Sequence, residues 1–166
     1  MSKRILLDDD DPLQRRRLKA APEQARFEVE LANEGRSALA RLVEPDHELA
    51  AVVLDLMMPE MGGLEVLDRL SAVGNTIPVV VQTGQGGIET VVKAMRAGAF
   101  DFVVKPVSPE RLTLALGNAL KAARITRSIT AERRRSSRVA ARPACLSASI
   151  RISACWLRTS CAKSSA

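Results

Sequence analysis

The chain has 166 residues, of which 25 are Lys or Arg and 19 are Asp or Glu, so its formal charge is +6, and 46% of the residues are hydrophobic. This length fits one ordinary domain with an extension and excludes two full catalytic domains. No apolar stretch reaches the roughly 18 to 20 residues that cross a bilayer, and the acidic run near the start excludes a secretory signal, so we expect a soluble, cytoplasmic protein without a membrane part.

Short apolar runs alternate with longer amphipathic segments through the first three quarters of the chain. The runs are rich in Val, Ile and Leu, which is typical of buried strands, and the longer segments have helical periodicity. In chain order, the predicted elements are a strand at 4–7, a helix at 12–25, a strand at 27–31, a helix at 36–43, a strand at 50–54, a helix at 64–73, a strand at 78–81, a helix at 88–97, a strand at 102–104 and a helix from 109 to about 124.

Five strands that alternate with five helices predict an α/β fold with a parallel sheet covered on both faces. The common doubly wound order for a (βα)5 chain of this size is 2-1-3-4-5, in which the first and third strands are neighbours. Sites in such sheets form beyond the carboxyl ends of the strands. Functional side chains are therefore expected at those ends.

Acidic side chains follow two strands that the predicted topology makes neighbours. Residues 8–11 are all Asp, and Asp55 follows the third strand. An acidic run is more often a solvated loop, and a single Asp after a strand is often a helix cap. Carboxylates that converge in one crevice repel each other, however, and are tolerated mainly with a hard cation such as Mg²⁺. With a hydroxyl at Thr83 and a cation at Lys105 after the next two strands, the set suits a phosphoryl group.

Four segments resemble the receiver domain of two-component response regulators, a flavodoxin-like fold. They read ILLDDDDPLQRRRL, VVLDLMMPEMGGLEVL, VVVQTG and GAFDFVVKP, and they are spread over most of residues 4–120. Thr83 and Lys105 lie 28 and 50 residues beyond Asp55. The segment TGQGGIETVVKAMRAGAFDFVVKPVSPERL is similar to receivers of sigma-54-dependent, NtrC-type transcription activators, although the chain has no G-x-x-x-x-G-K-[ST] loop of the ATPase that follows them.

The resemblance implies a phosphorelay function centred on the acids. Asp55 would accept a phosphoryl group from a sensor histidine kinase and form an aspartyl phosphate. Asp9 and Asp10 would hold Mg²⁺ together with Asp55 and the backbone carbonyl of Met57. The domain would act as a signalling switch and not as a turnover enzyme.

The resemblance also assigns the residues that respond to the phosphoryl group. Lys105 would pair with the acceptor and then with a phosphoryl oxygen, and it would precede Pro106 through a cis peptide. Thr83 and Phe102 would form the switch pair. Their movement would reshape the face made by the fourth helix, fifth strand and fifth helix, which would regulate transcription through an output partner or a homodimer.

Some positions depart from the family pattern. The acidic pair falls on Asp9 and Asp10, so Asp8 occupies a place that is usually apolar, and an alternative register makes Asp8 and Asp9 the pair. A buried, ionised Asp8 would cost several kcal/mol, so it must be protonated, paired or shifted outward. Pro22 lies inside the first predicted helix and predicts a kink or a shortened helix. Arg26 stands where receivers often have glycine. These departures support an alternative function, that of a degenerate receiver that docks or dimerises without efficient phosphorylation.

The charge divides the chain into two parts. Residues 1–120 carry 14 basic and 18 acidic side chains, whereas residues 121–166 carry 11 basic and one acidic. We therefore predict a receiver domain at 1–125 and a basic tail, rich in Ser, Arg and Ala, at 126–166. The tail is interpreted as a frameshifted or truncated remnant, as a disordered segment, or as a basic arm of a DNA-binding regulator. Its three Cys make a weak zinc site, and a disulfide is disfavoured in a reducing cytoplasm.

Overall fold

The computed structural model describes residues 3–44, 48–84 and 88–140. Its elements, in order, are β1 (Lys3–Asp8), α1 (Pro12–Gln24), β2 (Phe27–Ala32), α2 (Gly35–Val43), β3 (Leu49–Asp55), α3 (Gly63–Ala72), β4 (Val79–Thr83), α4 (Ile88–Arg96), β5 (Asp101–Val104) and α5 (Pro109–Ala140). The strands form one parallel sheet in the order β2-β1-β3-β4-β5, which confirms the predicted doubly wound α/β fold.

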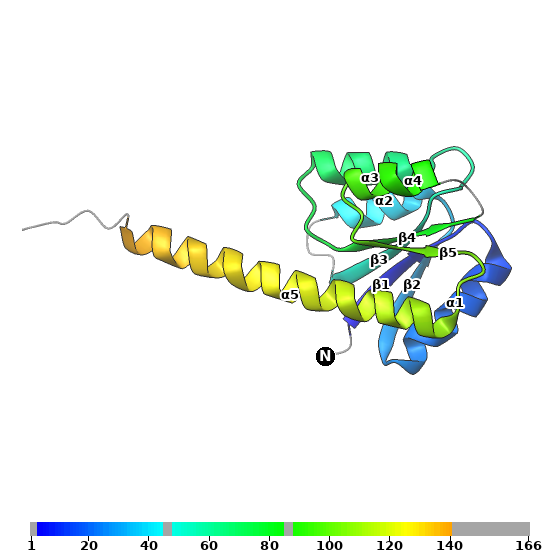
Figure 1. Ribbon diagram of the computed structural model, residues 1–166, viewed down its shortest axis with the longest axis horizontal. Coiled ribbons are helices and arrows are strands. Elements are labelled where there is room, and N and C mark those ends of the chain that lie inside the picture. Colours follow the sequence, from blue (N-terminus) through cyan, green and yellow to red (C-terminus); the bar gives the residue numbers. More distant parts are fainter. Residues whose placement is uncertain (1–2, 45–47, 85–87, 141–166) are drawn as a thin grey trace, which may run out of the picture.

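The helices cover the sheet in two layers. Helices α2, α3 and α4 lie on one face, and α1 and α5 lie on the other (Figure 1). Successive strand side chains point to opposite faces, so Ile5 and Leu7 of β1 pack with α1 and α5, while Leu6 packs in the core on the other side. The apolar runs are continuous along the sequence because both faces are buried.

Helix α5 is longer than predicted. It continues to Ala140, so the expectation that it ends near Arg124 is wrong. Residues 118–142 contain no Gly or Pro, and many are Ala or Arg, which favour a helix. All side chains from Arg124 to Glu132 are exposed, and Ile125 and Ile129 are the large apolar residues among them, so this part of the helix has too few apolar positions for a helical period to be recognised. In Figure 1 it projects away from the sheet.

The expectations for the rest of the tail lie outside the described residues. These are residues 141–166, which include all three Cys. Within the residues that are described, no helix is both long enough and apolar enough to cross a membrane.

Two sequence departures fall at the end of α1. Pro22 lies in its last turn and is buried, and the helix still continues to Gln24, so the proline does not shorten it. A proline has no amide hydrogen, which removes one hydrogen bond of that turn. Arg26 adopts a φ of 64°, in the left-handed region that glycine occupies without strain.

Candidate functional site

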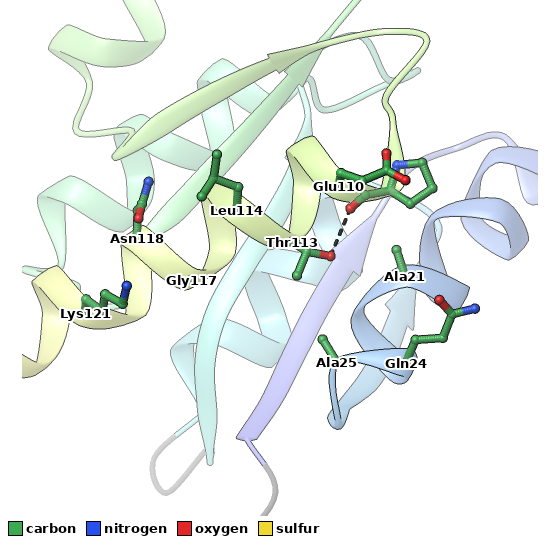
Figure 2. Close-up of a pocket in the computed structure, with 10 residues that line it drawn as sticks. Ala21, Gln24, Ala25, Glu110, Thr113, Leu114, Gly117, Asn118 and Lys121 are labelled. Atoms are coloured by element: carbon green, nitrogen blue, oxygen red, sulfur yellow. Dashed lines mark hydrogen bonds between the residues drawn. The ribbon is translucent and has the colours of Figure 1, made fainter.

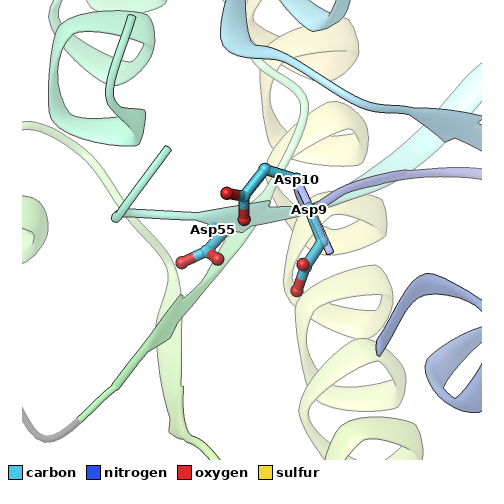
Figure 3. Close-up of side chains that lie close together, drawn as sticks. All are labelled: Asp9, Asp10 and Asp55. Carbon is cyan, nitrogen blue, oxygen red and sulfur yellow. The ribbon is translucent and has the colours of Figure 1, made fainter. Parts of the chain in front are cut away.

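Three carboxylates meet where β1 and β3 end. These strands are neighbours, with Asp8 opposite Leu54, so the residues that follow β1 lie beside Asp55. One oxygen from each of Asp9, Asp10 and Asp55 lies within 4.8 Å of the others (Figure 3). We call these three residues the carboxylate cluster. The structure thus brings together the acids that the sequence assigned to a cation.

The four consecutive aspartates have four different environments. Asp8 and Asp9 are completely buried, whereas Asp10 is exposed. The carboxylate of Asp9 accepts from the amide of Asp11 at 2.9 Å. Asp11 caps α1, because its side chain accepts from the amide of Leu13 at 2.8 Å, and this bond lowers the pKa of its carboxyl. The run is therefore only partly a solvated loop.

Asp55 is the buried carboxylate at the end of β3. Its Oδ1 accepts from the amide of Met57 at 3.0 Å, and its Oδ2 accepts from the ammonium of Lys105. Burial raises the pKa of Asp55, although the bonds from Lys105 and Met57 oppose this effect. A Cβ at Gly63 would lie 2.2 Å from the carbonyl oxygen of Asp55, so only glycine permits α3 to begin this close to the strand.

Lys105 joins two members of the cluster. Its ammonium donates to Asp9 Oδ2 at 2.8 Å and to Asp55 Oδ2. Burial would lower the pKa of Lys105, but the bonds to Asp55 and Asp9 outweigh it and raise the pKa. The Lys105–Pro106 peptide bond is cis. A fixed cation thus stands beside a buried carboxylate, an arrangement that suits phosphoryl transfer.

Asp8 shows that the cluster is short of positive charge. Both of its carboxylate oxygens are buried, and neither has a hydrogen-bond partner among the described residues. Burial, and then the charges of Asp55 and Asp9, raise the pKa of Asp8 to about 7. The ammonium of Lys105 and the guanidinium of Arg15, whose charge also acts on Asp8, do not compensate four neighbouring carboxyl groups. The donor set, made of carboxylate oxygens with an exposed member open to water, fits Mg²⁺.

The predicted switch residues lie on the other face of the sheet from Lys105. Thr83, at the end of β4, is buried, and its hydroxyl donates to the carbonyl of Gly84 at 3.2 Å and not to the cluster. Phe102, on β5, is 37% exposed. In the strand register Thr83 lies opposite Val104 and Phe102 opposite Val81, so both switch positions are at the β4–β5 end of the sheet.

Two residues near the cluster were missed from the sequence. The guanidinium of Arg15 donates to the carbonyl of Asp9, whereas three consecutive arginines suggest only a solvated helix face. Gln82 is completely buried at the end of β4. Gln82 could have been recognised in the sequence as a polar residue that interrupts the apolar run VVVQT.

The largest hollow is not at the cluster. It lies between α1 and α5, has a volume of about 630 Å³ and includes Ala21, Thr113 and Gly117 in its lining (Figure 2). A smaller hollow of about 420 Å³ borders the site through Asp11 and Lys105. The charged groups, and not the size of a cavity, therefore locate the chemistry.

Comparison with known proteins gives a consistent result. Residues 5–117 match the family described as the response regulator receiver domain. The chain is 38% identical over 120 residues to regulatory protein AtoC of Escherichia coli (strain K12). The matched region covers 71% of this chain and 25% of AtoC. It is 34% identical to transcriptional regulatory protein ZraR of Klebsiella oxytoca, over 77% of this chain and 28% of ZraR. The chain thus spans about a quarter of the length of these relatives.

Solved structures share the fold. NtrX from Brucella abortus superposes with a TM-score of 0.73 at 33% identity, over 82% of this chain and 30% of NtrX. The signal receiver domain of a putative Luxo repressor protein from Vibrio parahaemolyticus has a TM-score of 0.72 at 25% identity, over 78% of this chain and 98% of that domain. These relatives support the likeness to receivers of NtrC-type regulators.

Proposed function

The chain belongs to the response regulator receiver domain family, and from that premise we propose that it accepts a phosphoryl group from a sensor histidine kinase onto Asp55. The observation that carries this proposal is the bridge that Lys105 makes between Asp55 and Asp9. It places a buried nucleophilic carboxylate next to a fixed cation, inside a cluster of acids that calls for a second cation.

The residues of the chain provide most of the groups that phosphoryl transfer needs. An oxygen of Asp55 forms the bond to phosphorus while the bond from phosphorus to the histidine nitrogen breaks, and the histidine keeps the electron pair. The amide of Met57 holds the Asp55 carboxylate in place. The ammonium of Lys105, which starts on Asp55, then pairs with a phosphoryl oxygen. Positioning and charge neutralisation of this kind supply most of the catalysis in phosphoryl transfer.

The carboxylate cluster would hold Mg²⁺. Asp9, Asp10 and Asp55 are the proposed ligands, with the carbonyl of Met57, and the bound ion would neutralise charge on the equatorial phosphoryl oxygens. The unpaired carboxylate of Asp8 supports the need for a cation. It also keeps open the register in which Asp8 and Asp9 form the acidic pair.

The phosphoryl group would act on the β4–β5 end of the sheet. Thr83 would exchange its bond to Gly84 for a bond to the phosphoryl oxygen, and Phe102 would turn inward into the space that Thr83 leaves. The change would alter the face formed by α4, β5 and α5, which would bind an output partner or a second copy and so regulate transcription. The domain acts in this proposal as a switch and not as a turnover enzyme.

The test is labelling by acetyl phosphate in the presence of Mg²⁺, followed by mass spectrometry of the intact protein. We expect the wild type to gain one phosphoryl group and Asp55→Asn to gain none. Asp68→Asn is the matched control, because Asp68 is exposed on α3. Undiminished labelling of Asp55→Asn would contradict Asp55 as the acceptor. An unlabelled wild type that also fails to bind Mg²⁺ at millimolar concentration would leave the degenerate docking module as the better account.

A second candidate function is binding to DNA through α5. The helix exposes Lys121, Arg124 and Arg127, and from Lys121 onward its described side chains include a single acid, Glu132. A basic helix that projects from the domain can neutralise phosphates without base recognition.

A further inference from the structure

The side-chain amide of Gln82 is buried and has no hydrogen bond to any residue that the structure describes. It lies at the carboxyl end of β4 and is completely inaccessible to solvent. Neither its Oε1 nor its Nε2 has a partner in the described part of the chain. Buried amides are nearly always bonded, so an unbonded one calls for a physical reason. An apolar side chain of the same size would fill this place with less penalty.

The strand register places this amide between the two central groups of the site. Gln82 lies opposite Asp55 on β3 and opposite Val103 on β5. Val80 and Val103 both pack in the core under α1 and α5, and side chains alternate along a strand, so Gln82 points to that same face. Lys105 follows Val103 by two residues, lines a hollow with Gln14 and Arg17 of α1, and donates to Asp55. The amide is thus flanked by the strands that carry the carboxylate and the ammonium.

The ammonium of Lys105 has capacity for a further bond. An ammonium has three protons, and in the structure two of them are donated, to Asp9 and to Asp55. When Lys105 moves from Asp55 to a phosphoryl oxygen, it keeps its bond to Asp9, and an acceptor for its third proton would fix its position further. The carboxamide oxygen of Gln82 is an unused acceptor on the adjacent strand.

We propose that Gln82 is a positioning residue for Lys105, whose carboxamide oxygen accepts a proton of the ammonium, directly or through one water, while Lys105 pairs with the incoming phosphoryl group. This inference rests on the proposed function of Asp55. It explains why a polar group is retained in an apolar strand: its bond is made in the reacting state, so it stabilises the transition state more than the resting protein.

The test compares the wild type with Gln82→Met, which keeps the volume and removes the polar atoms. Initial rates of labelling are measured over a range of acetyl phosphate concentrations in Mg²⁺, with urea unfolding of each protein in parallel. We expect the maximal rate of Gln82→Met to fall about tenfold, which corresponds to about 1.4 kcal/mol, with an unchanged half-saturating concentration and a urea midpoint that is equal or higher. Val80→Ala is the control, because Val80 is buried on the same face of the same strand.

The outcomes separate this inference from the proposed function. Labelling of Gln82→Met at the wild-type rate overturns the role of Gln82, as does a loss of rate that follows a lower urea midpoint or appears equally in Val80→Ala. A wild type that is not labelled, or an Asp55→Asn variant that is, contradicts the proposed function itself.

Discussion

At the scale of the residue, Asp8 is the acid with the least support around it. Its carboxyl is buried, unpaired among the described residues, and close enough to Asp55 and Asp9 for their charges to act on it. Such a group is retained at a cost to stability whenever it is ionised. The cost depends on pH and on whether a cation is bound.

This environment predicts the pH dependence of folding in the absence of divalent cations. The folded protein keeps a proton on Asp8 up to about pH 7, while the unfolded chain releases it near the ordinary value of 3.8. The folded state therefore binds more protons between these values, and stability falls as pH rises, by at most about 1.4 kcal/mol per pH unit for this group. Asp8→Asn should flatten the slope of the unfolding free energy between pH 4 and 7, measured by urea denaturation in EDTA.

Asp10→Asn is the matched control, because Asp10 belongs to the same run but is exposed. Its slope should match that of the wild type. A wild type and an Asp8→Asn variant with the same slope would show that Asp8 is paired or hydrated in solution.

Those site residues that directly follow a strand could be predicted from the sequence. Asp55, Thr83 and Lys105 come after apolar runs, and the topology of a parallel sheet gathers such residues at one edge. The burial of Asp8 and Gln82 was not predictable in this way. The predicted strands ended at residues 7 and 81, whereas the structure continues them to Asp8 and Thr83, and a residue inside a strand is committed to a core face.

At the scale of the element, α5 divides into a packed part and an exposed part. Leu112, Leu116 and Ala119 are buried against the sheet, whereas side chains from Arg124 to Glu132 are exposed. The packed part was recognised from its periodicity, and the exposed part was missed because propensity alone extends it. The contribution of α5 to the stability of the domain therefore comes from its packed part.

A chain that ends at residue 125 should consequently have the same free energy of unfolding in urea as the full chain, within about 0.5 kcal/mol. It should also be labelled at Asp55 at the same rate. Circular dichroism should show the loss of helical signal that removal of the exposed part requires. A clearly lower midpoint would mean that residues after 125 belong to the fold.

The same truncation tests the DNA hypothesis. Retention of the full chain on DNA should fall steeply with salt and disappear in the truncated chain if α5 neutralises phosphates. Equal retention of both chains would assign any DNA binding to the receiver domain, and no retention of either would remove this candidate.

At the scale of the whole molecule, the formal charge of +6 describes neither part of the chain. Residues 1–120 are net acidic, and the basic excess is confined to residues 121–166. The charge thus indicates where the domain ends and does not describe what the domain binds. A candidate binding surface is apolar and lies on α4, β5 and α5.

The edge strand β5 and its neighbouring helices expose several large apolar side chains. They are Val92 and Met95 on α4, Phe102 and Val104 on β5, and Leu114 on α5, each 37% to 57% exposed. An exposed apolar face on this side of the sheet is typical of an interaction surface. Because Phe102 belongs both to this face and to the proposed switch pair, phosphorylation of Asp55 would change the face directly.

We therefore predict that phosphorylation promotes a homodimer through this face, and that Met95→Glu weakens the dimer at least tenfold. In a two-fold dimer the substitution introduces two charges that must lose their hydration. Sedimentation velocity with and without acetyl phosphate and Mg²⁺ should show a dimer only for the labelled wild type and for Val43→Glu, the control on α2, where Val43 is 52% exposed. Because Met95 is remote from the carboxylate cluster, Asp55 should be labelled normally in Met95→Glu. A labelled wild type that stays monomeric, or a Met95→Glu variant that dimerises fully, would contradict dimerisation through this face.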